Sequence, residues 1–208
     1  MKRGKLALIA CTLALAFTGC ILPKEFEARL DVEKDGRYAF HYEGTIVSLG
    51  MLADRENGQM DEEQEREAAT ELMENLKNLG LVTDISYLGN AVFKVSCMET
   101  GNVLQRPLRM GLKGDKPGPW EFYVFTFEPS ADGTGAVFRF LPDIDSEEMK
   151  ARYPASGFAM KGTLALTTDL AVESSVGDPF HDTHSGAYIW TVDGLNEKMP
   201  AMTLKLKE

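Results

Sequence analysis

The chain has 208 residues, of which 26% are charged, and a mean hydropathy of −0.20, values typical of folded rather than disordered proteins. Its formal net charge is −10, which argues against a general nucleic-acid binder, because such proteins present a basic surface to phosphates. Three cysteines are too few for a disulfide-rich scaffold. The length predicts one domain or two small ones.

Residues 1–19 have the three parts of a secretory signal. An apolar stretch over 6–17 is shorter than the roughly 20 residues that a transmembrane helix needs. The small residues Thr18 and Gly19 follow it. The positive charges precede it at Lys2, Arg3 and Lys5. The sequence therefore predicts export from the cytoplasm and no spanning helix.

The four residues FTGC, which end at Cys20, resemble the lipobox of bacterial lipoproteins, with Phe17 where leucine is usual. The resemblance implies cleavage before Cys20 and acylation of its sulfur and new amino group. Several acyl chains anchor a protein stably where one does not. Ile21 stands where an aspartate would favour the inner membrane, so the outer membrane, facing the periplasm, is favoured in a Gram-negative cell. A plain secretory signal that ends in Cys is the alternative.

The mature chain is expected to comprise a short tether over 20–25 and a single domain over 26–208. Losing the three basic residues of the signal lowers the formal net charge to −13, so lipid rather than a basic patch must attach the protein to its membrane. Cys97 becomes the one free thiol, and its position in an apolar alternation predicts that it is buried.

Alternating apolar and polar residues predict a strand from Phe26 to Val32, and Asp35-Gly36 is typical of a hairpin turn. The 61–79 segment is the strongest helix, because Asp61 and Gln64 have the spacing of a capping box. Its apolar stripe has helical spacing. Further strands are expected at 83–87, 91–97, 121–128, 136–141, 158–168, 187–193 and 202–206, and a short helix at 146–152. Gly89-Asn90 is a two-residue turn signal between the first two of these strands.

These elements predict an α+β fold, in which one antiparallel sheet system carries the single long amphipathic helix on a face. The 113–119 loop is a candidate domain boundary, but one domain is the simpler arrangement.

Two of the three histidines lie in one short segment, which makes it the best candidate metal site or acid-base cluster. Imidazole and carboxylate ligands suit zinc. The neighbouring Pro179 and Gly186 indicate a loop, where spacing alone does not define a site, so an ordinary polar turn is the alternative. The candidate ligands are Asp178, His181, Asp182 and His184. No cofactor is indicated elsewhere.

The two tryptophans are candidates for lining a lipid or glycan pocket. Trp120 follows a Pro-Gly-Pro loop, and Trp190 lies in a predicted strand. Core packing is the alternative for both residues.

The strand order also resembles the LppM-like lipoprotein domain. The shared features are the lipobox, the strand before Asp35-Gly36, a helix, and the hairpin sequence VTDISYLGNAVFKV. This resemblance implies a small envelope domain without catalysis and assigns no functional residues.

Three functions follow as hypotheses. The first is a non-enzymatic lipoprotein that binds another envelope component, most simply a protein. The second is a carrier of a lipid or another small apolar ligand, and the third is a metal-dependent hydrolase that uses His181 and His184. No nucleic-acid partner is expected.

Overall fold

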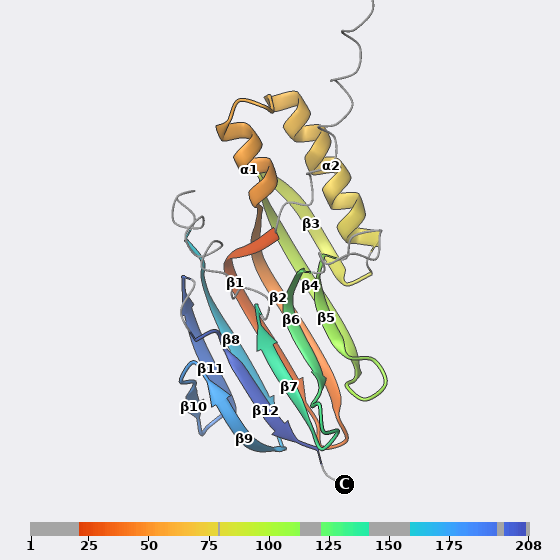
Figure 1. The fold of residues 1–208 in the computed structure, drawn as a ribbon, viewed down its shortest axis with the longest axis vertical. Coiled ribbons are helices and arrows are strands. Elements are labelled where there is room, and N and C mark those ends of the chain that lie inside the picture. Colours follow the sequence, from red (N-terminus) through yellow and green to blue (C-terminus); the bar gives the residue numbers. More distant parts are fainter. Residues whose placement is uncertain (1–20, 79, 113–121, 142–158, 195–197, 207–208) are drawn as a thin grey trace, which may run out of the picture.

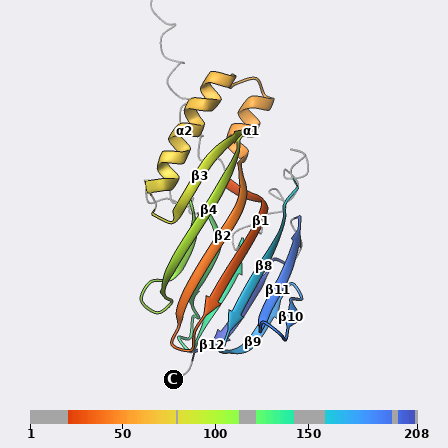
Figure 2. The same cartoon turned by 180° about the vertical axis from the view of Figure 1, so that it is seen from behind.

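A computed structural model describes residues 21–78, 80–112, 122–141, 159–194 and 198–206. Two β-sheets lie face to face, and a pair of helices covers one end of them (Figure 1). The same arrangement is seen from behind in Figure 2, where the larger sheet is in front. The fold is therefore α+β in the broad sense that the sequence predicts.

The larger sheet has seven strands in the order β10-β11-β8-β1-β2-β4-β3. All of its pairs are antiparallel except β1 with β8, which is parallel. The bounds are β1 Ile21–Val32, β2 Arg37–Ser48, β3 Val82–Gly89, β4 Val92–Asn102, β8 Lys161–Thr168, β10 Phe180–Asp182 and β11 Ala187–Asp193.

The smaller sheet has five antiparallel strands in the order β5-β6-β7-β12-β9. The bounds are β5 Leu108–Leu112, β6 Phe122–Pro129, β7 Gly135–Phe140, β9 Ala171–Val176 and β12 Ala201–Lys205. The expectation of an antiparallel system is thus confirmed within this sheet, while the pairing of β1 with β8 departs from it.

An aromatic core fills the space between the sheets. Phe125 of β6 has no exposed surface, and its ring centroid lies 5.1 Å from those of Phe40 and Phe140. Phe26 of β1 packs against the same group, 5.4 Å from Phe140. These side chains come from both sheets, so one core holds the sandwich together.

Helix α2 (Glu62–Asn78) matches the predicted long helix, and its capping box forms as expected. Asp61 Oδ1 accepts hydrogen bonds from the backbone N–H groups of Glu63 and Gln64 at 3.0 and 2.9 Å. Gln64 Oε1 accepts one from the backbone N–H of Asp61 at 2.9 Å. The reciprocal pair satisfies donors that would otherwise have no partner at the helix start.

The structure adds a helix that the sequence did not predict, because α1 (Leu49–Glu56) precedes α2, so the long helix does not stand alone at this end. Ser48 caps α1 by accepting a hydrogen bond from Met51 N–H at 3.4 Å. Only Met51 is buried in this helix, so its eight residues carry too little apolar periodicity to be recognised from the sequence. The predicted helix over 146–152 lies outside the described residues.

Two boundaries also differ from the sequence expectation. Strand β1 begins at Ile21, and Leu22 is fully buried, so 21–25 belong to the sheet rather than to a tether. The turn between β3 and β4 is centred on Asn90 and Ala91, whose φ values are 54° and 57°. It lies one residue later than the predicted Gly89-Asn90 turn.

Candidate functional site

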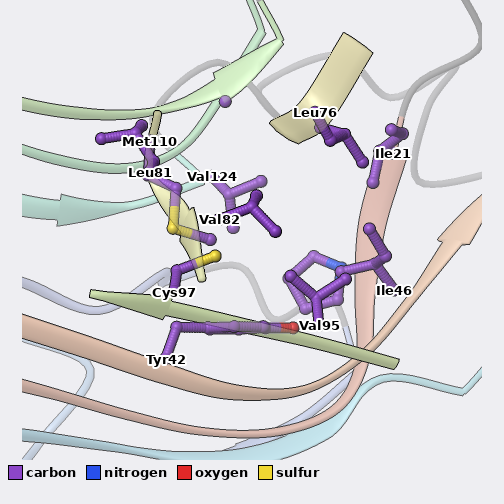
Figure 3. A pocket seen from close by; sticks show the side chains of 12 residues that line it. Ile21, Tyr42, Ile46, Leu76, Leu81, Val82, Val95, Cys97, Met110 and Val124 are labelled. Carbon is purple, nitrogen blue, oxygen red and sulfur yellow. The ribbon is translucent and has the colours of Figure 1, made fainter. Parts of the chain in front are cut away.

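A cavity of about 50 Å³ opens at the helical end of the sandwich, and we call it the sandwich-end pocket (Figure 3). It is bounded by the last turn of α2, the first residues of β1, and strands from both sheets. Its lining consists of Ile21, Pro23, Tyr42, Ile46, Leu76, Leu81, Val82, Val95, Cys97, Met110, Gly111 and Val124. None of these described lining residues is charged, so the pocket suits an apolar ligand.

Irregularities in both sheets coincide at this pocket. The β1–β2 register shifts between Pro23 and Phe26, and the β5–β6 register shifts between Met110 and Gly111. A bulge bends a strand and increases its twist. Gly44 permits the close approach of β1 to β2, because a Cβ there would lie 2.3 Å from a backbone oxygen of β1. We attribute the cavity to these two bulges, which interrupt regular strand packing on opposite walls.

Two side chains bring polar atoms to the pocket wall, and neither is suited to acid-base chemistry at neutral pH. Burial raises the pKa of the Cys97 thiol to about 12. Burial also raises the pKa of Tyr42, whose hydroxyl donates a hydrogen bond to the carbonyl oxygen of Thr45 at 3.3 Å. A protonated thiol is a poor nucleophile, so the arrangement favours binding over covalent catalysis. Cys97 is buried, as its strand phase predicts.

A buried carboxylate fastens the first turn of α2 to the larger sheet, at the other end of the helix from Leu76. Glu65 is only 4% exposed and accepts hydrogen bonds from the Tyr87 hydroxyl and, at 2.9 Å, from the Ala91 backbone N–H. Arg55 of α1 lies 3.1 Å from its other oxygen. Burial alone would raise the pKa of Glu65, but these hydrogen bonds and the Arg55 charge together hold it below the usual value. The cluster thus joins α1, α2 and the β3–β4 turn.

Sequence analysis did not single out Glu65, although a signal was present. The residue shares the helical phase of Ala69, Leu72 and Leu76, so it lies on the apolar stripe of α2. A carboxylate on such a stripe needs hydrogen-bond partners when buried. The helical phase therefore identifies Glu65 as a buried carboxylate, but it does not identify the donors, which come from other helices and strands.

A second hollow, of about 520 Å³, lies on the outer face of the seven-stranded sheet. It is wide and lined by charged and polar side chains together with apolar ones, which come from β8, β1, β2, β4 and β3. Glu27 faces Glu43 across the β1–β2 pair, and Arg29 faces His41. Met98, which is 52% exposed, adds an apolar contact at its side. This surface suits a hydrated partner rather than an apolar chain.

The four residues of the candidate metal site lie around the short β10–β11 hairpin. The His181 ring stacks on Tyr188 with centroids 4.3 Å apart, whereas Asp178 lies in the corner before β10. Asp182 accepts hydrogen bonds from the Ser185 hydroxyl at 2.6 Å and the His184 backbone N–H at 3.0 Å. These bonds, that from Ser185 foremost, lower the pKa of Asp182 and hold the turn.

Within the described residues, no group of three or more His, Cys, Asp and Glu side chains could hold a metal ion. The metal site therefore stays a prediction without a ligand cluster in that part of the chain. Adjacent residues of a strand point to opposite faces, which separates His181 from Asp182.

Of the two candidate pocket tryptophans, Trp190 lies in the described residues. Trp190 is 1% exposed, packs against Phe138, and donates a hydrogen bond from Nε1 to the carbonyl oxygen of Val176 at 2.9 Å. It lines neither of the two cavities above and belongs to the core. Trp120 and the predicted lipidation site Cys20 lie outside the described residues.

No helix in the described ranges is both long and apolar enough to cross a membrane. A scan against protein-family models gives no match, and a search of curated proteins finds no significant relative. A search of solved structures finds the NMR structure of the folded domain of Mycobacterium tuberculosis LppM, with a TM-score of 0.38 and 10% identity. That similarity covers 94% of this chain and 95% of the other. A likeness at this level carries no conclusion about function.

Proposed function

We propose that this chain is a lipid-anchored protein of the bacterial cell envelope whose domain binds one apolar chain, such as a lipid acyl chain, in the sandwich-end pocket. The observation that carries the proposal is that the pocket's lining, as far as the described residues show it, is uncharged. Each buried methylene group contributes about 0.8 kcal/mol, so the affinity should rise about fourfold with each methylene that enters the pocket.

The size of the pocket limits the ligand. Its volume of about 50 Å³ is well below the roughly 150 Å³ of an engineered cavity that binds benzene. The pocket therefore takes the end of a chain rather than a ring or a bulky headgroup. Further insertion requires its walls to move, and Leu76 and Met110 line it from the helix and from the smaller sheet.

The anchor is the second part of the proposal. Cys20 directly precedes Ile21, the first residue of β1, so acylation there would hold the helical end of the sandwich at the membrane. Replacing Cys20 by serine is expected to release the protein from membranes without unfolding the domain. Persistence of the Cys20→Ser variant in the membrane fraction at high salt would show that the anchor lies elsewhere.

Ligand binding is tested on the mature chain with Cys20→Ser, titrated with a fluorescent fatty acid that brightens in apolar surroundings. Saturable one-to-one binding is expected. Val82→Phe, at a half-buried position in the lining, should weaken binding about tenfold, which is the loss of roughly two methylene contacts. Val172→Phe, a half-buried valine of β9 away from the pocket, is the matched control. Equal affinities of both variants would place the ligand elsewhere.

Binding of another envelope protein is the second candidate function, and the wide polar hollow on the outer face of the seven-stranded sheet favours it. In-cell crosslinking should then trap one specific species, and His41→Glu together with Met98→Glu should abolish it. If no specific species is trapped in intact cells, this candidate loses its support. The hydrolase hypothesis has no ligand cluster to support it among the described residues.

A further inference from the structure

We propose that the resting occupant of the sandwich-end pocket is an acyl chain carried by the protein's own Cys20. The inference rests on the proposed function, because it requires both the lipidated cysteine and an apolar pocket. It adds that anchoring and ligand binding use the same cavity. A lipid cargo would therefore have to displace the protein's own chain into the bilayer.

Cys20 is next in the chain to a residue of the pocket wall. Ile21 is at once the residue after Cys20 and part of the pocket wall, beside Leu76 in Figure 3. Consecutive Cα atoms lie about 3.8 Å apart, so the acyl groups start within a few ångströms of the lining. Ile21 pairs with Ser48 and Leu22 is fully buried, so no free tether carries the anchor away from the domain.

An acyl chain attached to Cys20 has a high effective concentration at the pocket. A chain attached one residue from its binding site meets that site as an intramolecular ligand, at millimolar or higher effective concentration for a short link. A lipid from the bilayer must instead be withdrawn and ordered in a separate event. At equal contact with the wall, the attached chain therefore occupies the pocket first.

The pocket is too small to hold all the acyl chains of a lipidated cysteine. The pocket admits the end of one chain, whereas lipobox cysteines are acylated on both sulfur and nitrogen and so carry more than one. The remaining chains stay in the bilayer, so occupation of the pocket is compatible with membrane attachment. The walls near Ile21 and Leu76 are apolar, and the lining residues that the structure describes carry no charge.

Cys97 provides a built-in reporter, because its thiol lines the pocket and is the one free thiol after acylation of Cys20. We would measure its reaction with methyl methanethiosulfonate in the acylated full-length mature protein in nanodiscs. The comparison is the Cys20→Ser protein held on nickel-chelating nanodiscs by an N-terminal histidine tag, which keeps the bilayer near but removes the acyl chain. The high thiol pKa slows both reactions alike.

The acylated protein is expected to react about tenfold more slowly, which corresponds to roughly nine-tenths occupancy of the pocket. Val82→Phe, which fills the pocket, should bring the two rates together, while Val172→Phe should leave the difference intact. Melting temperatures of both variants establish that they fold.

Equal Cys97 rates in the acylated and tagged proteins would overturn the inference. The proposed function would still stand if the Cys20→Ser protein bound the fatty-acid probe. If that protein failed to bind any probe while the rates differed, the pocket would serve the anchor alone, and the carrier function would fall. The two failures are therefore distinguishable.

Discussion

The middle of the sandwich and its helical end are built from different side chains, and only one of them leaves space. In the middle, aromatic rings from both sheets interdigitate, with Phe125 at 5.1 Å from Phe40 and Phe140. At the helical end, mainly aliphatic side chains face one another across two bulged strands and line a cavity of about 50 Å³, with the Tyr42 ring at the border between the two regions. Large flat rings fill the gap between sheets, whereas short branched chains leave a cavity when the strands bend apart.

If the proposed function is right, stability and binding are separated along the long axis of the molecule. The aromatic rings in the middle bury apolar surface when the protein folds, whereas the sandwich-end pocket leaves space for a ligand. Substitutions in the middle should therefore change stability alone, while substitutions at the end should change binding as well.

The largest effect is expected from Phe125→Ala. The ring is fully buried and contacts other rings from both sheets, so its removal should cost about 3–5 kcal/mol of unfolding free energy. Denaturant unfolding of the Cys20→Ser background measures this cost. A loss below about 1 kcal/mol would mean that the aromatic middle does not hold the sheets together.

Leu76→Ala should cost less, about 2–3 kcal/mol, at the low end for a buried leucine because one side of Leu76 already faces a cavity. The same change enlarges the pocket, so the fatty-acid probe should bind more tightly. Unfolding and titration are done on one preparation. A stability loss with unchanged probe affinity would separate Leu76 from the binding site.

Glu65→Gln should cost about 1–3 kcal/mol near neutral pH, because it removes a charge from a buried cluster whose Arg55 partner is partly exposed. The folded-state pKa of Glu65 lies below its unfolded value of about 4.3, so its contribution is complete above that pH. The contribution is lost as the pH falls through the folded pKa.

Denaturant unfolding between neutral pH and pH 3 measures this dependence. The difference between wild type and Glu65→Gln should shrink on acidification, since the wild-type carboxylate becomes protonated. A difference that does not change with pH would show that Glu65 is already neutral in the folded protein.

The smallest effect is expected from His181→Ala with His184→Ala, at most about 1 kcal/mol, since both residues lie on the exposed hairpin and only His181 stacks on another ring. Elemental analysis of the unsubstituted protein gives the complementary measurement. Stoichiometric zinc that disappears in the double variant would revive the metal hypothesis.

Local signals made much of the secondary structure predictable. The capping box at Asp61 and Gln64 and the alternation from Phe26 to Val32 operate over a few residues, and both appear in the structure as expected. Helix α1 was missed because eight residues with one buried side chain give no clear periodicity. The turn at Asn90 and Ala91 was misplaced by one residue, since the neighbouring Gly89 also favours a turn.

The candidate site was not predictable in the same way. The lining of the sandwich-end pocket comes from β1 to β6 and the segment around the end of α2, and no spacing in the sequence links Ile21 with Val124. Trp190, a predicted pocket residue, was instead buried by Phe138 of the other sheet. Likewise, the buried Glu65 acquired its partners from α1, from β3 and from the β3–β4 turn.

The amino-acid sequence by itself determined the strand alternation and the start of α2, and it predicts an export signal that ends at Cys20. The alternation and the helix start depend on backbone hydrogen bonding and side-chain periodicity within short segments. Only the tertiary structure decided that β1 pairs in parallel with β8, that the two sheets stack, and that their bulges face one another. Those outcomes depend on which distant apolar surfaces bury each other, and a cavity is what remains where that packing is incomplete.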